Sequence, residues 1–263
     1  MSTPIIIQQQ FRGPPASGNG GYVSGVFTNQ LDLAGSVPGL SPAVEVTLRA
    51  PTPLDHPMYF APIDSARANI AQPDTVQGEV RDGDTVIAQM ASTTLDLSVP
   101  TPPSFAEALA CQKDSLSLSD SIVNTEVAGL GFHPICFCCG ADVPVNKGLR
   151  VFAAAVPGFD GVAAAWRAPA CFADEHGMLP EPIVWAALDC PGQFAYRVAG
   201  IQTGLLGRMT GRIIKQVSVH DEITVIGWCI AVEGKKHFAG TALFDQAGEC
   251  CAISKQVWIG RRN

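Results

Sequence analysis

The chain has 263 residues, of which 47% are hydrophobic and 16% are charged, and its formal net charge is −7. This composition is typical of a globular chain with a large core and excludes a disordered protein. The negative charge and the lack of a basic stripe argue against a nucleic-acid partner. No apolar run reaches the roughly 20 residues that span a bilayer, so we expect no membrane partner.

The nine cysteines bear on the redox compartment. They are odd in number and scattered through apolar contexts in a large chain, which favours reduced thiols over a disulfide framework. The start of the sequence lacks the charged and long apolar regions of a signal peptide. We therefore expect a cytoplasmic protein.

Strand-like runs outnumber helix signals along the chain. The first predicted helix covers 20–34 and opens at Asn19-Gly20-Gly21, where Asn is a favourable N-cap. Short helices are predicted at 104–112 and 181–190. Alternating apolar and β-branched residues predict strands at 43–50, 85–93, 148–156, 161–168, 211–219, 222–232, 237–245 and 251–260.

The middle of the chain differs from both flanks. Residues 99–134 begin with "VPTPPS", continue with polar "KDSLSLSDS" and end in "GLGFHP". This composition indicates a linker that contains one short helix. It would divide the chain into two units, 1–98 and 135–263.

The two predicted units resemble each other. "VEVTLRAPTPLDHPMYF" (44–60) is similar to "GRIIKQVSVHDEITVIG" (211–227), with Leu54 placed on Val219 at an offset of 165 residues, and Gly83 falls on Gly248 at that offset. Each unit then has a helix and a run of antiparallel strands. Because one helix cannot cover two sheets, we predict an α+β architecture in which a curved sheet wraps a central helix, made twice and joined side by side.

The third predicted helix carries an isolated acid. In "LPEPIVWAALDCPGQFA" (179–195), Asp189 stands within an apolar run, and Pro191 is expected to kink or end the helix beside it. Burying a carboxylate is costly unless it is paired or used. Asp189 is therefore a candidate catalytic residue, and the alternative is a carboxylate that caps a helix end or pairs with a buried arginine.

Two motifs resemble those of a known family. "CFCCGADVPVNKGLRVF" (136–152) resembles the "CFxCG…(N/H)P.GL.(L/I)" segment before the first strand of thioesterase-superfamily proteins, and "AALDCPGQFA" (186–195) resembles the "LLDEA" context of their acid. The chain thus resembles a double-hotdog member of the acyl-CoA thioesterase-like superfamily, which includes phenylacetate-pathway-type thioesterases. The resemblance implies an N-terminal hotdog repeat (1–98), the linker (99–134) and a C-terminal hotdog repeat (135–263).

The resemblance also implies a divided active site. In the family, the helix opens with His-Gly-Gly, a glycine N–H polarises the thioester carbonyl, and an Asp nine residues after the His acts as base or nucleophile. Here Pro180-Glu181-Pro182 replaces that opening, and proline has no N–H. The N-terminal unit keeps Gly20 and Gly21 but has Thr28 at the position of the acid. We therefore expect one composite site, in which Gly20 and Gly21 face Asp189.

Further residues are candidates for substrate binding. Asn19, Thr28 and Asn29 are polar neighbours of the expected site, and Trp185, one helical turn before Asp189, is expected to desolvate the acid. His176 would lie at the mouth, although a polar loop residue is the simpler interpretation. The cations available for the phosphates of CoA are Arg197, Arg208, Arg212 and Lys215.

A metal site is the alternative use of the cysteine motif. Cys136-x-x-Cys139 together with His133 suggests zinc, but a structural zinc site needs four ligands. No second Cys/His pair with suitable spacing follows in the sequence. We therefore expect no metal and assign the motif to apolar packing.

The predicted function is an acyl-CoA thioesterase that needs no cofactor, since CoA enters as part of the small-molecule substrate. The alternative is a hotdog module that binds an acyl-CoA, an aromatic CoA or a similar apolar ligand without turnover. An enoyl-CoA hydratase ranks third, because that chemistry requires a His five residues after the Asp, where this chain has Phe194. A double hotdog contains its own pseudo-dimer, so a monomer suffices, and a homodimer of double hotdogs is the further expectation.

Overall fold

The computed structural model describes residues 3–31, 33, 42–63, 76–118 and 133–260. Its α-helices are α1 (Gly20–Thr28), α2 (Phe105–Cys111) and α3 (Glu181–Val198). Its strands are β1 (Ile5–Ile6), β2 (Ala43–Leu48), β3 (Pro57–Ile63), β4 (Gln77–Asp82), β5 (Thr85–Thr93), β6 (Ala154–Ala155), β7 (Val162–Trp166), β8 (Leu205–Ile213), β9 (Ile223–Glu233), β10 (Lys236–Phe244) and β11 (Cys250–Ile259).

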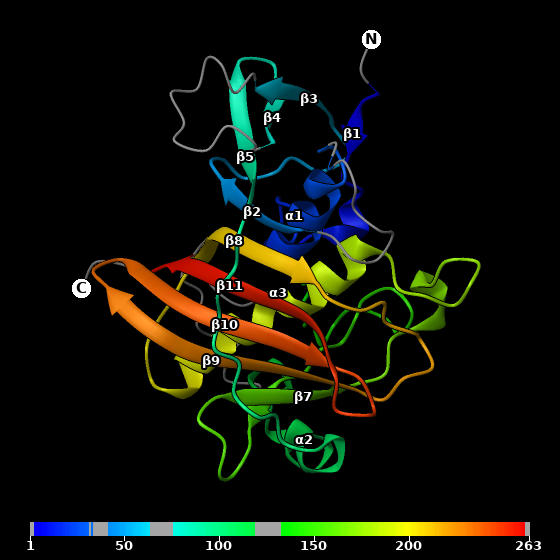
Figure 1. The fold of residues 1–263 in the computed structure, drawn as a ribbon, viewed down its shortest axis with the longest axis vertical. Coiled ribbons are helices and arrows are strands. Elements are labelled where there is room, and N and C mark those ends of the chain that lie inside the picture. Colours follow the sequence, from blue (N-terminus) through cyan, green and yellow to red (C-terminus); the bar gives the residue numbers. More distant parts are fainter. Residues whose placement is uncertain (1–2, 32, 34–41, 64–75, 119–132, 261–263) are drawn as a thin grey trace.

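The strands of the described residues form one antiparallel sheet (Figure 1). Their order is β1-β3-β4-β5-β2-β8-β11-β10-β9-β7-β6. The sheet passes from one half of the chain to the other where β2 pairs with β8, with Val44 opposite Gly211 and Thr47 opposite Arg208. The two predicted sheets are thus joined edge to edge by backbone hydrogen bonds.

The same unit occurs twice along the sheet. Helix α1 is followed by β2 to β5, and helix α3 is followed by β8 to β11. An offset of 165 residues moves β2 onto the end of β8 and β5 onto β11. It also superimposes two hairpin turns that need a left-handed backbone, where Gly83 has φ +54° and Gly248 has φ +77°. This correspondence supports the predicted duplication, and the predicted α+β architecture of a sheet around a helix in each half is confirmed.

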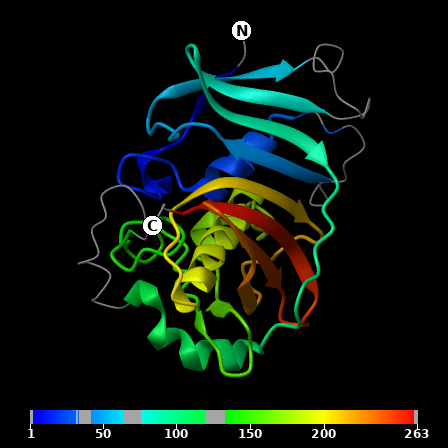
Figure 2. The ribbon, with the colours of Figure 1, turned by 90° about the vertical axis from the view of Figure 1, so that its left-hand side faces the viewer.

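The two long helices pack against each other on the concave side of the sheet (Figure 2). Helix α3 is buried from Ile183 to Tyr196, which fits its apolar residues on every side. Close packing of α1 against α3 depends on glycine. A Cβ at Gly21 would lie 2.4 Å from the Trp185 carbonyl oxygen, and one at Gly25 would lie 2.6 Å from Pro182 Cα. No helix of the described residues is both long and apolar enough to cross a membrane.

Helix α3 corrects its predicted bounds of 181–190, because it does not end beside Pro191. It continues through the proline to Val198. A proline inside a helix costs about 3 kcal/mol, since it removes a backbone hydrogen bond. Burial of the helix against β9 offsets this cost, and Gly227 permits the approach: a Cβ there would lie 2.3 Å from the Pro191 carbonyl oxygen.

Other predicted boundaries also move. The helix predicted over 20–34 ends at Thr28, and residues 32 and 34 lie outside the described residues. The strand predicted over 148–156 is reduced to Ala154–Ala155, and the strand predicted over 211–219 instead occupies Leu205–Ile213. Helix α2 agrees with its prediction within one residue at each end, and much of the predicted linker lies outside the described residues.

Candidate active site

The N-terminus of α1 presents polar groups toward α3. Asn19 caps the helix, because its side-chain oxygen accepts the N–H of Tyr22 at 2.9 Å. The amide Nδ2 of Asn19 remains available and donates to Asp189 Oδ2 at 2.7 Å. Within the described residues the N–H of Gly20 has no hydrogen-bond partner. A free N–H at a helix N-terminus is suited to a developing negative charge.

Asp189 projects from the middle of α3 toward that helix end. Its Oδ2 accepts a second hydrogen bond from the N–H of Gly21 at 3.0 Å. Its Oδ1 has no partner among the described residues, although the residue is only 3% exposed. The structure therefore brings together Asp189 and the Asn19-Gly20-Gly21 segment, which lie about 170 residues apart in sequence.

Burial raises the pKa of Asp189 well above its usual range. Negative charge on Cys138 and Cys136 acts in the same direction. The Gly21 N–H and the Asn19 amide favour the charged carboxylate and lower the pKa, but they offset only part of the increase. The carboxyl group therefore takes up a proton at a higher pH than an exposed aspartate does.

A cavity of about 620 Å³ opens beside these groups. Asn19, Gly20 and Asp189 form part of its polar lining, and both halves of the chain contribute its walls. Its volume lies within the range of small-molecule sites, roughly 300–1,000 Å³. The apolar lining includes Leu48, Pro51, Leu205, Leu206, Trp258 and Ile259.

Three of the predicted substrate-binding residues lie elsewhere. Thr28, Asn29 and Trp185 line a second, smaller cavity of about 250 Å³. The Thr28 hydroxyl donates to the Gly25 carbonyl oxygen at 2.9 Å. The ring of Trp185 packs on Gly211, where an added Cβ would lie 2.7 Å from it. The side chain of Trp185 therefore does not cover the carboxylate of Asp189.

The loop histidine is also remote from the cavity. His176 lies before α3 with 78% of its side chain exposed, and its ring faces the Glu175 carboxylate at 3.6 Å. It is not among the residues that line either cavity. The simpler interpretation, a polar loop residue, agrees with this position.

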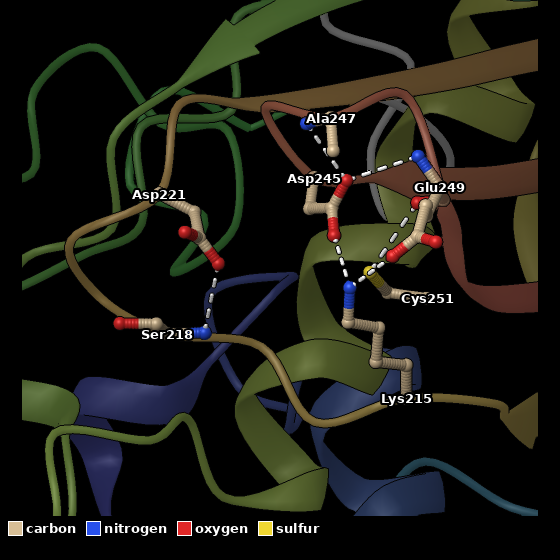
Figure 3. A network of polar contacts seen from close by, with 7 residues as sticks. All are labelled: Lys215, Ser218, Asp221, Asp245, Ala247, Glu249 and Cys251. Atoms are coloured by element: carbon tan, nitrogen blue, oxygen red, sulfur yellow. Dashed lines mark hydrogen bonds and ion pairs between the residues drawn. The ribbon is translucent and has the colours of Figure 1, made fainter.

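The four cations considered for CoA phosphates do not line the large cavity. Lys215 belongs to a surface network, in which its ammonium group contacts Asp245 at 2.6 Å and also Glu249 (Figure 3). Arg208 binds Glu45 and the hydroxyl of Thr47 across the β2–β8 pair.

Sequence reasoning missed Arg49 as a lining residue. It follows the end of β2 and lines the cavity, and its Nε donates to Gln89 Oε1 at 2.8 Å. Nothing in the sequence distinguishes Arg49 from other strand-end arginines. Its place at the cavity follows from the β2–β8 pairing, which sets the end of β2 beside the start of β8.

Sequence reasoning also missed thiols beside the carboxylate. Cys136, which lines the cavity, lies 3.7 Å from both Asn19 Nδ2 and the Cys190 thiol. Cys190 directly follows Asp189 in sequence, and this adjacency was the available signal. Its proximity to Cys136, 54 residues earlier, is a property of the fold.

Comparison with solved structures defines the fold. The chain is similar to an acyl-CoA thioesterase II, TesB2, from Mycobacterium marinum (14% identity, TM-score 0.54, 94% of this chain and 90% of that one). It is similar to a protein of unknown function with a hot dog fold from Alicyclobacillus acidocaldarius (11%, 0.52, 97% and 91%). It is also similar to the dehydratase domain of the polyketide protein PpsC from Mycobacterium tuberculosis (11%, 0.60, 100% and 92%).

These likenesses extend over nearly the whole chain and show that it has the double-hotdog fold. No family model matches the sequence, and no curated protein matches it closely enough to count as a relative. Sequence identity of 11–14% supports the fold alone. Because one fold carries several chemistries, the reaction has to be argued from the residues of the site.

Proposed function

We propose that the chain hydrolyses the thioester of an acyl-CoA in the large cavity between its two halves. The observation that carries the proposal is the pairing of two groups from different halves. These are the N–H of Gly20 at the start of α1, which has no partner among the described residues, and the carboxyl group of Asp189 on α3. Both residues line the cavity. Thioester hydrolysis needs a polarised carbonyl and an activated water.

In the proposed reaction, the thioester carbonyl oxygen accepts the Gly20 N–H. Asp189 Oδ1, which has no protein partner among the described residues, accepts a proton from water as the water oxygen attacks the carbonyl carbon. The proton then passes to the sulfur of CoA as the carbon–sulfur bond breaks. The products are a carboxylic acid and the CoA thiol.

Two other residues act as positioning residues in this scheme. Asn19 Nδ2 and the Gly21 N–H both bind Asp189 Oδ2, which fixes the carboxyl group and leaves Oδ1 for the water. The apolar lining suits an acyl chain or a pantetheine arm, and Arg49 offers a positive charge for a CoA phosphate.

The test is hydrolysis of a panel of acyl-CoAs, followed by detection of the released thiol. We expect Asp189→Asn to lower kcat/KM by about 10²- to 10⁴-fold, the usual contribution of a general base. Thr28→Val is the matched control, because Thr28 occupies the corresponding place on α1 and does not line the large cavity. Hydrolysis by Asp189→Asn at the wild-type rate would overturn the proposed mechanism.

Ligand binding without turnover is the second candidate. It is favoured by the burial of Asp189 and by the engagement of its Oδ2 with two donors. Calorimetry with a non-hydrolysable thioether analogue of an acyl-CoA separates the two functions. Binding of the analogue without release of thiol from any acyl-CoA would favour the binding module and exclude the hydrolase.

A further inference from the structure

Four buried cysteines meet beside the cavity, and the proposed hydrolysis uses none of them. Cys136, Cys138 and Cys139 lie in the loop before β6, and Cys190 lies on α3; each is at most 6% exposed. The Sγ atoms of Cys136, Cys139 and Cys190 all lie within 4.8 Å of one another. This thiol cluster combines ligands from two segments that are 51 to 54 residues apart.

The loop has a tight turn that presents its thiols together. The N–H of Gly140 donates to the Cys136 carbonyl oxygen at 2.7 Å. A Cβ at Gly140 would lie 2.4 Å from the Pro134 carbonyl oxygen and 2.6 Å from that of Cys136, so the turn requires glycine. Cysteines separated by two residues, as Cys136 and Cys139 are, have the spacing that zinc sites use for one pair of ligands.

The separation of the sulfur atoms matches metal coordination. With a zinc–sulfur bond of about 2.3 Å, two ligands of a tetrahedral site lie about 3.8 Å apart. Cys136 Sγ and Cys190 Sγ are 3.7 Å apart. A disulfide would bring the two sulfur atoms to about 2.05 Å, and all four cysteines are free thiols in the structure.

Cys138 is the fourth buried cysteine near these three, but its Sγ does not belong to the group whose sulfur atoms all lie within 4.8 Å of one another. We propose that Cys136, Cys139 and Cys190 bind one zinc ion, which fastens the loop to helix α3, and that Cys138 or His133 supplies the fourth ligand. The inference does not rest on the proposed hydrolysis. Because zinc binds thiolates, binding releases the thiol protons to solvent.

The surroundings of the cluster resemble the outer shell of a metal site. Asn19 Nδ2 lies 3.7 Å from Cys136 Sγ, so an amide N–H faces one of the ligands. His133 lies three residues before Cys136 and has a buried Nε2 without a partner in the described chain. Cys138 and His133 are therefore the two candidates for the fourth ligand, and the ligand is the one whose replacement (Cys138→Ser or His133→Gln) changes the Co²⁺ spectrum.

The first test measures metal in the full-length protein, purified without chelators, by elemental mass spectrometry. We expect about one zinc ion per chain, the content of a mononuclear site. We expect its loss in Cys136→Ser and Cys190→Ser, and its retention in the control Cys229→Ser, which changes an exposed thiol outside the cluster. Circular dichroism checks that each variant is folded.

The second test replaces zinc with Co²⁺, whose charge-transfer absorption reports thiolate ligands. We expect thiolate-to-cobalt absorption that weakens in Cys139→Ser and is unchanged in the control Cys229→Ser. Absorption that is unchanged in Cys139→Ser would overturn the assignment of Cys139 as a ligand. Wild-type protein that contains no zinc and binds neither Zn²⁺ nor Co²⁺ after reduction would overturn the site itself, as would a disulfide among the four cysteines found by mass spectrometry.

Discussion

Replacing Gly21 by alanine tests the contact between the two halves most directly. The added Cβ would lie 2.4 Å from the Trp185 carbonyl oxygen and 2.8 Å from Asp189 Cβ. Real Cβ contacts stay above 3.0 Å, so α1 and α3 must separate locally by at least 0.6 Å. Neither obstacle is the end of a flexible side chain, and the strain therefore falls on the helix backbones.

The expected magnitude follows from that clash. Overpacking of this kind costs about 1–3 kcal/mol. At roughly 2–4 °C per kcal/mol for a chain of this size, the Tm should fall by about 2–12 °C. A displacement of 1 Å at a reacting centre costs on the order of 10²-fold in rate, so kcat/KM for an acyl-CoA substrate should fall by about 10- to 100-fold.

Gly20→Ala is the matched control for this substitution. Its Cβ would meet Leu206 Cδ2 at 2.8 Å, which is the far end of a flexible side chain, and the substitution keeps the Gly20 N–H. Thermal unfolding and thiol release are measured on both variants in parallel. If Gly21→Ala unfolds at the temperature of Gly20→Ala or above and keeps wild-type activity, the described contact between α1 and α3 is wrong.

Three other perturbations have defined outcomes. Asn19→Ala removes the cap of α1 and one donor to Asp189, so we expect a loss of about 1–2 kcal/mol in denaturant unfolding; unchanged stability would contradict the capping geometry. If free Zn²⁺ is present at 1,000 times the Kd of the proposed site, its removal by a chelator should lower the free energy of unfolding by about 4 kcal/mol and the Tm by about 8–16 °C. The Cys190→Ser variant should show no effect of the chelator. Asp245→Ala should destabilise the β10–β11 turn at neutral pH, because the charged carboxylate accepts hydrogen bonds from Lys215 and from the backbone (Figure 3). Burial raises the pKa of Asp245, but these hydrogen bonds lower it on balance. A lowered carboxyl pKa gives stability that is present above the usual carboxyl pKa and is lost as the pH falls through the folded-state pKa, so the Tm difference from wild type should shrink in acid; a difference independent of pH would refute this.

The strands and helices that the sequence predicted well are those with strong local patterns. Alternation with β-branched residues identified β2, β5, β9, β10 and β11 within two residues at each end. Strands β3 and β4 were missed for physical reasons. Strand β3 contains Pro57 and Pro62, which argue against a central strand, and it lies near the edge of the sheet beside the two-residue β1. Strand β4 carries mainly polar residues and little apolar alternation.

The meeting of Gly21 with Asp189 could be anticipated because the resemblance implied a site divided between the two helices. The place of Trp185 could not be read from spacing alone. Helical side chains tilt toward the N-terminus of the helix, so the Trp185 ring leans away from Asp189, toward Gly211. The approach of Cys190 to Cys136 depends on how the loop folds over α3, and no local pattern encodes that contact.

The pairing of β2 with β8 has a consequence for folding. Backbone hydrogen bonds cross from one copy of the repeated unit to the other, and the α1–α3 contact crosses at the same place. Neither copy can unfold without exposing the sheet edge and the buried helix face of its neighbour. The unit of cooperativity is therefore larger than the unit of repetition, and the chain should melt in a single transition despite its internal duplication.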